Sequence, residues 1–201
     1  MTMLQKSHDK TRKLVSAGML SAISIILGMT PLGIIPIGPL SATTMHLPVI
    51  IGAVLEGPVV GLIIGAIFGG FSLYQAASGG SVLAPLFMNP LVSILPRLLI
   101  GPCAYFVFRS VQKLTKKRAL SAGCAAVAGT LTNTVGVMGF IYILYAQQYA
   151  AAMGLDPATV GAAILSASAL NGIPECAVAV IVTVGVTAAV WHMRGKGKAA
   201  K

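Results

Sequence analysis

The scarcity of charge along this chain is the feature that most limits what it can fold into. Only 9% of its 201 residues are charged and 56% are hydrophobic, whereas roughly 25% of the residues in a soluble domain carry charge. A water-soluble fold of this size could not cover its surface with so few charged side chains. The sequence therefore predicts an integral membrane protein rather than a soluble enzyme, with the bilayer as the solvent for most of its surface.

The apolar segments predict how the chain crosses this bilayer. A helix rises about 1.5 Å per residue, so roughly 20 apolar residues span the hydrocarbon. We predict an all-α bundle of six transmembrane helices at about residues 14–29, 45–55, 59–76, 91–111, 119–145 and 175–193, the second of which could begin as early as Ser41. The whole chain is then one transmembrane domain, with an N-terminal segment (1–13), the bundle (14–193) and a basic tail (194–201). The first apolar run is not followed by a small-residue cleavage site, so we expect it to remain as a helix.

The basic residues predict the orientation of the bundle. Apart from Arg97, every Lys and Arg falls in one of three clusters, at residues 6–13, 109–118 and 194–201. Basic residues near helix ends stay in the cytoplasm. If residues 45–76 formed one uninterrupted span, the cluster at residues 109–118 would lie outside. A turn at Glu56-Gly57-Pro58 instead places all three clusters and both termini on the cytoplasmic side. The net charge of +10 would then face cytoplasm and anionic headgroups of the plasma membrane rather than nucleic acid, and Glu56 is expected to be solvated.

Three connections would lie on the outer side, at residues 30–44, 77–89 and 146–172. They are long, almost uncharged and rich in Gly, Pro, Ser and Thr, which suits a lid or a binding site. In the third connection, Asp156 before Pro157 predicts a helix N-cap. The short helix that follows is expected to end at Leu170, before a break at residues 171–174.

Two charged residues stand out within the apolar segments. Arg97 lies two turns into the fourth predicted helix, where a charge costs several kcal/mol unless it is paired or faces water. This depth favours a functional site over a role in packing, and the planar guanidinium suits a carboxylate ligand. Glu175 is expected in the first turn of the last helix, at a similar depth. The sequence leaves open whether the two residues neutralise each other or line a pocket.

Polar uncharged residues provide further candidates. Asn133 lies in the middle of the fifth predicted helix among threonines, and an amide there needs a neighbour or a ligand, whereas threonines can bond their own backbone. Further candidates at the outer ends of helices are Asn89, Asn171, Thr43, Thr44, His46, Tyr74 and Gln75. Asn89 and Asn171 could instead cap helices, and the others could simply lie at the membrane interface.

Small residues recur every four positions in two helices, which allows close helix approach in lipid. Gly57, Gly61, Gly65 and Gly69 form such a stripe in the third helix, either inside the bundle or against another protein. The first helix carries Ala17/Ser21 and Gly18/Ala22 at the same spacing. One of these faces could be internal and the other could contact a partner.

Catalytic motifs are missing from the sequence. It has no GxxxxGK[ST] phosphate-binding loop, no HExxH, no His/Cys ligand cluster and no paired carboxylates for acid–base chemistry. We therefore expect no ATP hydrolysis by this chain, no metal and no cofactor. Cys103, Cys124 and Cys176 lie within apolar runs and are expected to be packing residues.

Four stretches of the chain resemble a known transporter family. They are PIGPLSATTMHLPVIIGAVLEGPVVGLIIGAIFG, NPLVSILPRLLIGP, GTLTNTVGVMGFIY and GIPECAVA, and they are similar to the substrate-binding S-components of energy-coupling factor (ECF) vitamin transporters, in the branch of the pantothenate and riboflavin components. The resemblance implies a six-helix subunit that binds a vitamin from outside, beneath the outer loops. It also implies docking on a transmembrane coupling protein driven by two cytoplasmic ATPases, through small residues of the first helix.

The resemblance also implies roles for the candidate residues. Arg97 would bind a ligand carboxylate, and Glu175, Asn133, Asn89 and Asn171 would take hydroxyl and amide groups. Pantothenate, which has a carboxylate, an amide and two hydroxyls, fits this set, while riboflavin, a pyridoxine-type vitamin and folate remain open. Three competing hypotheses remain. The first is an autonomous secondary permease for a carboxylate-bearing metabolite, with Glu175 as the candidate group for proton coupling. The others are a membrane enzyme and a structural membrane subunit.

Overall fold

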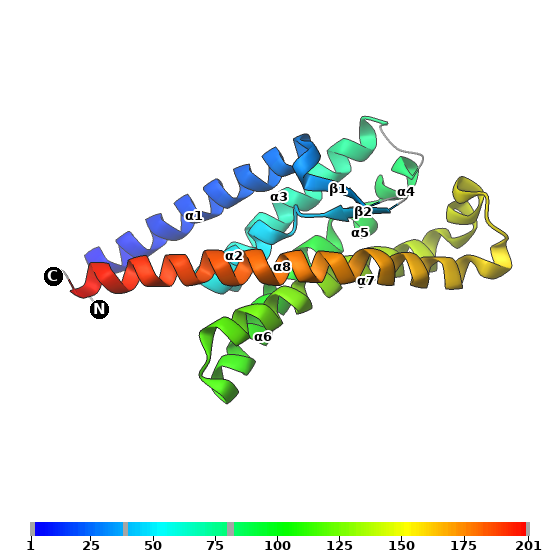
Figure 1. Ribbon diagram of the computed structural model, residues 1–201. Coiled ribbons are helices and arrows are strands. Elements are labelled where there is room, and N and C mark those ends of the chain that lie inside the picture. The colour runs from blue at the N-terminus through cyan, green and yellow to red at the C-terminus, as the bar shows by residue number, and fades with distance from the viewer. Residues whose placement is uncertain (1–2, 38–39, 80–82, 200–201) are drawn as a thin grey trace.

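The computed structural model describes residues 3–37, 40–79 and 83–199, which form an elongated helical bundle with one small β-hairpin (Figure 1). Within these residues, five helical segments are long and apolar enough to cross a membrane. They are α1 (Met3–Met29), α3 (Pro58–Ala77), the nearly continuous α5 (Pro90–Ser93) and α6 (Leu95–Thr115), α7 (Arg118–Met153) and α8 (Val160–Ala199). The structure thus shows a helical membrane protein with five candidate spans, and the count of six spans stays a prediction.

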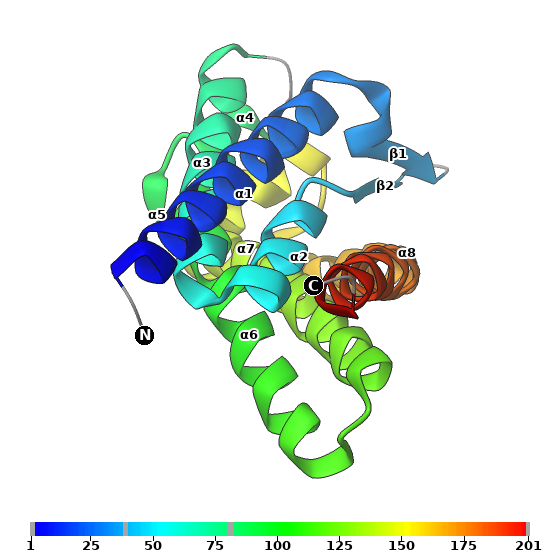
Figure 2. The same ribbon diagram turned by 90° about the vertical axis from the view of Figure 1, so that its left-hand side faces the viewer.

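The second of the six predicted helices, which is not among the five candidate spans, forms the central helix of the bundle. α2 (Leu47–Glu56) has ten residues, of which nine are buried, and it is too short to span the bilayer alone. It packs against α1, α3, α6, α7 and α8, and Figure 2 shows it between α1 and α8. Its apolar character therefore reflects burial in protein as much as contact with lipid.

A β-hairpin, rather than the loop expected at residues 30–44, connects α1 to α2. It comprises the turn η1 (Pro31–Gly33) and the antiparallel strands β1 (Ile34–Ile37) and β2 (Leu40–Thr43), so the second helix does not begin at Ser41. Ser24 Oγ in α1 donates a hydrogen bond of 2.8 Å to the carbonyl of Met45. α2 consequently begins inside the bundle, beside the last turns of α1 and shortly after the hairpin in the chain.

The other two outer connections also contain helix. The second includes α4 (Ala84–Phe87), and the third is mostly the end of α7, the turn η2 (Pro157–Thr159) and the first turns of α8. The backbone N–H of Ala158 donates to Asp156 Oδ1 at 2.9 Å, which confirms the predicted cap. The break predicted at 171–174 is wrong, because α8 continues through Pro174. Within a membrane, an interrupted helix would leave several backbone groups unsatisfied, whereas one proline removes a single donor.

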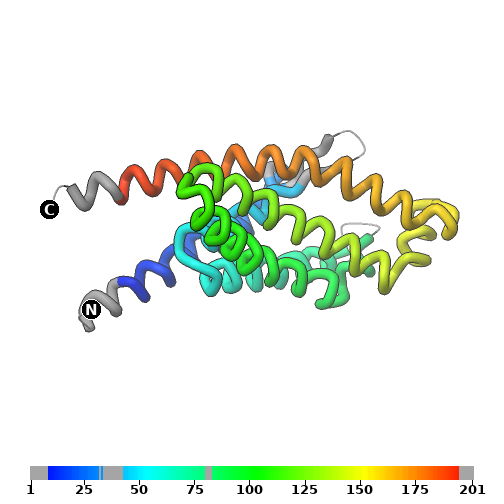
Figure 3. Tube along the Cα trace, turned by 90° about the horizontal axis from the view of Figure 1, so that it is seen from below, coloured from blue at the N-terminus to red at the C-terminus, as the bar shows by residue number. Residues whose placement is uncertain are grey.

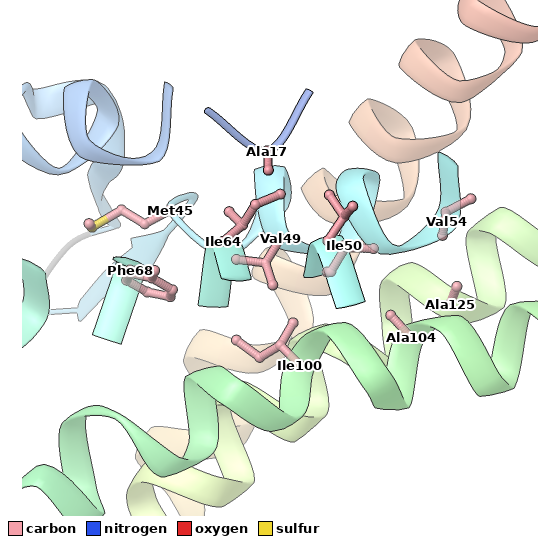
Figure 4. Close-up of a cluster of buried hydrophobic side chains, with 11 residues drawn as sticks. Ala17, Met45, Val49, Ile50, Val54, Ile64, Phe68, Ile100, Ala104 and Ala125 are labelled. Carbon is pink, nitrogen blue, oxygen red and sulfur yellow. The ribbon is translucent and has the colours of Figure 1, made fainter. Parts of the chain in front are cut away.

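The glycine stripe of α3 packs inside the bundle, against α6 and the residues just before it. A Cβ at Gly61 would lie 2.8 Å from the Cα of Gly101, and one at Gly69 would lie 2.9 Å from the Cα of Ile94. Side chains of α1, α2, α3 and α6 fill the space around this crossing, including Ile50, Ile64 and Ile100 (Figure 4). Gly57 differs from the rest of the stripe, because its φ of 106° makes the turn between α2 and α3.

The basic clusters converge on one end of the molecule, which we call the basic end. Arg12 of α1 contacts Glu56 Oε2 with its Nη2 at 3.2 Å, and Arg194 of α8 pairs with the other oxygen. Arg118, at the start of α7, lies 5.7 Å from the ring centroid of Trp191 in α8. Figures 1 and 3 accordingly show the start of α1 and the end of α8 on the same side. This arrangement agrees with a single cytoplasmic face, while the orientation in the membrane stays a prediction.

Glu56 is not solvated, contrary to expectation. The residue is only 6% exposed, because the turn folds back under the ends of α1 and α8. Its two ion pairs join these helices, which are the first and last of the chain, to the central α2.

Candidate functional site

A cavity of about 560 Å³ lies toward the end opposite the basic end. Its wall is formed by the last turns of α3, the first turn of α6, the middle of α7 and α8, and residues beside the hairpin and α4. Ligand pockets for small molecules enclose roughly 300–1,000 Å³. The cavity therefore has the size of a small-molecule site, and its wall includes residues from segments far apart in the sequence.

Arg97 faces this cavity from the first turn of α6. The residue is 6% exposed, and its Nη1 donates to the carbonyl of Val92 at 2.6 Å. Its guanidinium carbon lies 5.5 Å from the ring centroid of Phe68 and 5.7 Å from that of Phe87, so an aromatic ring of α3 and one of α4 flank the cation. In the described part of the chain, we find one acceptor for its five N–H donors. The cation is therefore buried but only partly satisfied, which is the state expected of an anion-binding group.

Glu175 lies in the middle of α8, not in a first turn, because α8 already begins at Val160. Its Oε1 accepts hydrogen bonds from the backbone N–H of Thr43 at 2.7 Å and from Thr43 Oγ1 at 3.1 Å, and its Oε2 accepts one from Thr134 Oγ1 at 3.0 Å. The carboxylate thus connects β2, α7 and α8. Within the described residues its bonds go to these threonines and it forms no ion pair with Arg97, so the neutralising pair left open by the sequence does not form.

Asn133 presents an unused acceptor to the cavity. It is 6% exposed, and its Oδ1 has no hydrogen-bond partner in the part of the chain that the structure describes. A buried orphan of this kind is uncommon and requires an explanation. The threonines beside it behave differently: Thr132 donates to its own helix at Ala128, at 2.7 Å, and Thr130 bonds to His46 Nε2 at 2.9 Å.

Six of the ten binding residues predicted from the sequence line the cavity. They are Arg97, Glu175, Asn133, Asn171, Thr43 and Gln75. Asn171 lies one turn before Glu175 in the continuous α8, so it is not the cap that the sequence allowed. Gln75 Nε2 donates to the carbonyl of Gly28 at 2.8 Å and thereby joins α3 to α1 at the rim.

The other four predicted binding residues lie outside the wall. Asn89 caps α5 by accepting the backbone N–H of Leu91 at 2.9 Å, and its amide donates to the hydroxyl of Tyr145 at 2.9 Å. His46 is 1% exposed and lies behind the wall, Thr44 is buried, and Tyr74 is 68% exposed on the outer surface. None of these four residues is part of the described cavity wall.

The rest of the described wall was not predicted. It consists of Met45, Phe68, Ser72, Ala76, Ser78, Ala84, Phe87, Thr134, Val137 and Met138. Helical spacing could have found some of them, because residues four apart share a face, and Val137 follows Asn133 at that spacing. Phe87 carried no comparable signal, because its place beside Arg97 depends on how α4 folds back.

The small residues of α1 divide into a buried and an exposed pair. Ala17 is 2% exposed and Ser21 is 4% exposed, and both pack into the bundle. Gly18 has nothing within 4 Å of the position of a Cβ, and Ala22 is also exposed. Ala17 and Ser21 are consequently not accessible to a partner, whereas the face with Gly18 and Ala22 is.

Comparison with known proteins gives one family match whose residue range contains the described cavity wall, and two similar transporters. The model of a family described as "ECF transporter, substrate-specific component" matches residues 12–187. The chain is 31% identical over 170 residues to the pantothenic acid transporter PanT of Lactococcus lactis subsp. cremoris, covering 78% of this chain and 81% of that protein. It is 33% identical over 141 residues to the pantothenate transporter PanT of Leuconostoc mesenteroides subsp. mesenteroides, covering 66% of this chain and 69% of that one.

Proposed function

The chain belongs to the family of substrate-specific components of ECF transporters, and we propose that it captures pantothenate from outside the cell for uptake. Family membership makes it a multi-pass membrane protein of vitamin transport, and the family and the relatives are transporters rather than enzymes. The relatives that transport pantothenate support this vitamin as the ligand.

The observation that carries the proposal is Arg97, a buried cation in the cavity wall with unused donors. A guanidinium binds a carboxylate through two parallel hydrogen bonds, and both bonds are stronger where water is excluded. Phe68 and Phe87 exclude water on the flanks of this guanidinium. The carboxylate of pantothenate supplies the anion that such a site lacks.

The remaining polar groups of the wall suit the rest of the ligand. Asn133 Oδ1 is an acceptor without a donor among the described residues, and the Glu175 carboxylate lies close by, since Thr134, the next residue, donates to it. The two hydroxyls and the amide N–H of pantothenate are donors for such groups. Val137 and Met138 provide apolar surface for its carbon skeleton.

We propose that partner subunits supply the energy, because the sequence has no phosphate-binding loop of its own. These partners are the transmembrane coupling protein and the two cytoplasmic ATPases of an ECF module. The accessible face of α1, with Gly18 and Ala22, is the proposed docking surface. The basic end then faces the cytoplasm and the cavity faces outside, with the hairpin and α2 together making the sixth crossing.

Calorimetry on the purified chain in detergent tests the ligand. We expect saturable binding of pantothenate, and mass spectrometry of the purified protein should identify the same molecule. Arg97→Gln should weaken binding by about 30-fold or more, since removing one partner of a buried charge pair costs roughly 2–5 kcal/mol. Arg109→Gln, on the exposed far part of α6, is the matched control and should bind normally. Normal binding by a folded Arg97→Gln variant would exclude Arg97 from the site.

Reconstituted vesicles separate the two transport hypotheses. A substrate-binding component without its module should bind pantothenate but not accumulate it. Accumulation driven by a proton gradient, in vesicles that contain only this chain, would instead establish the autonomous permease.

A further inference from the structure

The described cavity wall contains a buried arginine, Arg97, and a buried glutamate, Glu175, which form no ion pair with each other. We propose that Glu175 is a specificity determinant that rejects any ligand with a second anionic group, so that the site admits a monocarboxylate with hydroxyl donors and excludes the phosphate monoester of the same molecule. This inference rests on the proposed function, because it assumes that Arg97 holds the ligand carboxylate.

The first argument is the charge inventory of the wall. Arg97 and Glu175 are the only charged side chains among the described residues that line the cavity. A monocarboxylate uses the single cation. A second anion would find no other cation in the wall and would instead meet the carboxylate of Glu175, in a site where the low dielectric strengthens the repulsion.

The second argument is how Glu175 is held. Its Oε1 accepts a hydrogen bond from the backbone N–H of Thr43, a group that can only donate. The carboxylate also accepts hydrogen bonds from the hydroxyls of Thr43 and Thr134. Charge-assisted hydrogen bonds from three donors hold a carboxylate in place even where it is buried. The side chain is consequently fixed to the wall by β2 and α7 and cannot easily turn away from an incoming anion.

The third argument is the orphan acceptor of Asn133, which is independent of Glu175. Its Oδ1 is buried in the same wall and has no donor in the part of the chain that the structure describes. A hydroxyl or an amide N–H would satisfy it, whereas a phosphate carries about −1.5 to −2 charges at neutral pH and provides mainly acceptors. The polar wall of α7 and α8 therefore favours ligand donors both by charge and by hydrogen bonding.

A purely structural role for Glu175 makes a different prediction. If Glu175 only fastened the hairpin through Thr43, its substitution would weaken the binding of every ligand by the same factor. If it selects against anions, its substitution changes the ratio of two affinities. The ratio of the dissociation constants for 4′-phosphopantothenate and pantothenate is therefore the quantity to measure.

The experiment uses calorimetry with the full-length protein in detergent and both compounds. The wild type should prefer pantothenate by about 100-fold or more, and Glu175→Gln should reduce this preference at least tenfold by admitting the phosphate ester. Thr43→Val is the matched control. It removes one hydroxyl that donates to Glu175 but keeps the Glu175 carboxylate, so the ratio of the two dissociation constants should equal that of the wild type.

The outcomes distinguish this inference from the proposed function. Equal binding of both compounds by the wild type, or an unchanged ratio in Glu175→Gln, overturns the inference and leaves the proposed function intact. Failure of the wild type to bind pantothenate overturns the proposed function. Should Glu175→Gln not fold, Asn133→Asp makes the reciprocal change, because it adds a negative charge to the same wall; it should increase the preference for pantothenate about tenfold, and no increase overturns the inference.

Discussion

Gly65 of α3 lies directly against the backbone of Arg97 in α6, so that a Cβ at residue 65 would come within 2.3 Å of the Arg97 carbonyl oxygen. The same approach of the two helices brings the Arg97 guanidinium over the ring of Phe68, one turn further along α3. The glycine stripe thus does more than let two helices pack closely. It places the cation of the proposed ligand site.

The first prediction concerns this contact. Gly65→Ala should lower both the thermal stability of the protein and its affinity for pantothenate, because the obstructing atom belongs to backbone and only a shift of the whole helix can relieve the clash. We expect about a tenfold or larger loss of affinity, equivalent to roughly 1.4 kcal/mol. Thermal unfolding and calorimetry in detergent would measure the two effects.

Gly70 provides the control on the same helix. A Cβ there would meet nothing within 4 Å, and alanine favours a helix over glycine by roughly 1 kcal/mol. Gly70→Ala should therefore leave affinity unchanged and stability equal or higher. An equal loss of affinity in both variants would show that the effect does not depend on the contact with Arg97.

The second prediction concerns the buried carboxylate at the basic end. Glu56→Gln should lower stability by roughly 1.5–3 kcal/mol, the usual contribution of a hydrogen bond to a charged group, because it weakens the bonds to Arg12 and Arg194. Pantothenate affinity should change little, since Glu56 is remote from the cavity. Asp9→Asn is the control, because Asp9 forms only a partly exposed pair with Arg12. A Glu56→Gln variant as stable as the wild type would contradict this role.

The third prediction separates the two faces of α1. Gly18→Leu has open space and should leave folding and pantothenate binding intact, yet block uptake in cells that supply the ECF module, because the side chain would obstruct the proposed docking surface. Ala17→Leu enters the packed interior and should cost roughly 1–3 kcal/mol in stability. Normal uptake by the Gly18→Leu variant would exclude this face as the docking surface.

The fourth prediction compares two threonines of α7. Thr134→Val removes the hydroxyl that donates to Glu175 and should weaken pantothenate binding by about tenfold, since hydrogen bonds to charged groups are worth roughly 1.5–3 kcal/mol. Thr132→Val removes a hydroxyl that bonds only its own helix, at Ala128, and should be nearly neutral. Calorimetry on the two proteins gives the comparison, and equal affinities would mean that the Thr134 bond does not support the site.

Sequence reasoning was most successful where the signal is local. The isolated position of Arg97 within an apolar segment predicted a cavity-lining cation, and Asp156 before Pro157 predicted a cap. It failed where a sequence motif that forms a turn in water stays helical inside the membrane. The Asn-Gly-Ile-Pro segment at residues 171–174 is typical of a turn in water, but in α8 the helix continues, because backbone groups freed by a break have little water to bond.

Two other differences arose from long-range packing. Residues 30–44 were expected to form a loop, and the structure has a hairpin whose strand β2 reaches Glu175, 132 residues further along the chain. Glu56 was expected to face water, but α1 and α8 converge on it. Neither contact has a signature in the sequence near the residues concerned.

The sequence by itself determined that this is a membrane protein with one isolated cation inside an apolar segment, because apolar length and charge act along the chain without regard to neighbours. Only the tertiary structure decided that, within the described residues, Arg97 and Glu175 line one cavity without forming an ion pair with each other. The position of Arg97 depends on how closely α3 and α6 approach at Gly65. The hydrogen bonds of Glu175 depend on where the hairpin places Thr43. Such distances result from the packing of many segments at once.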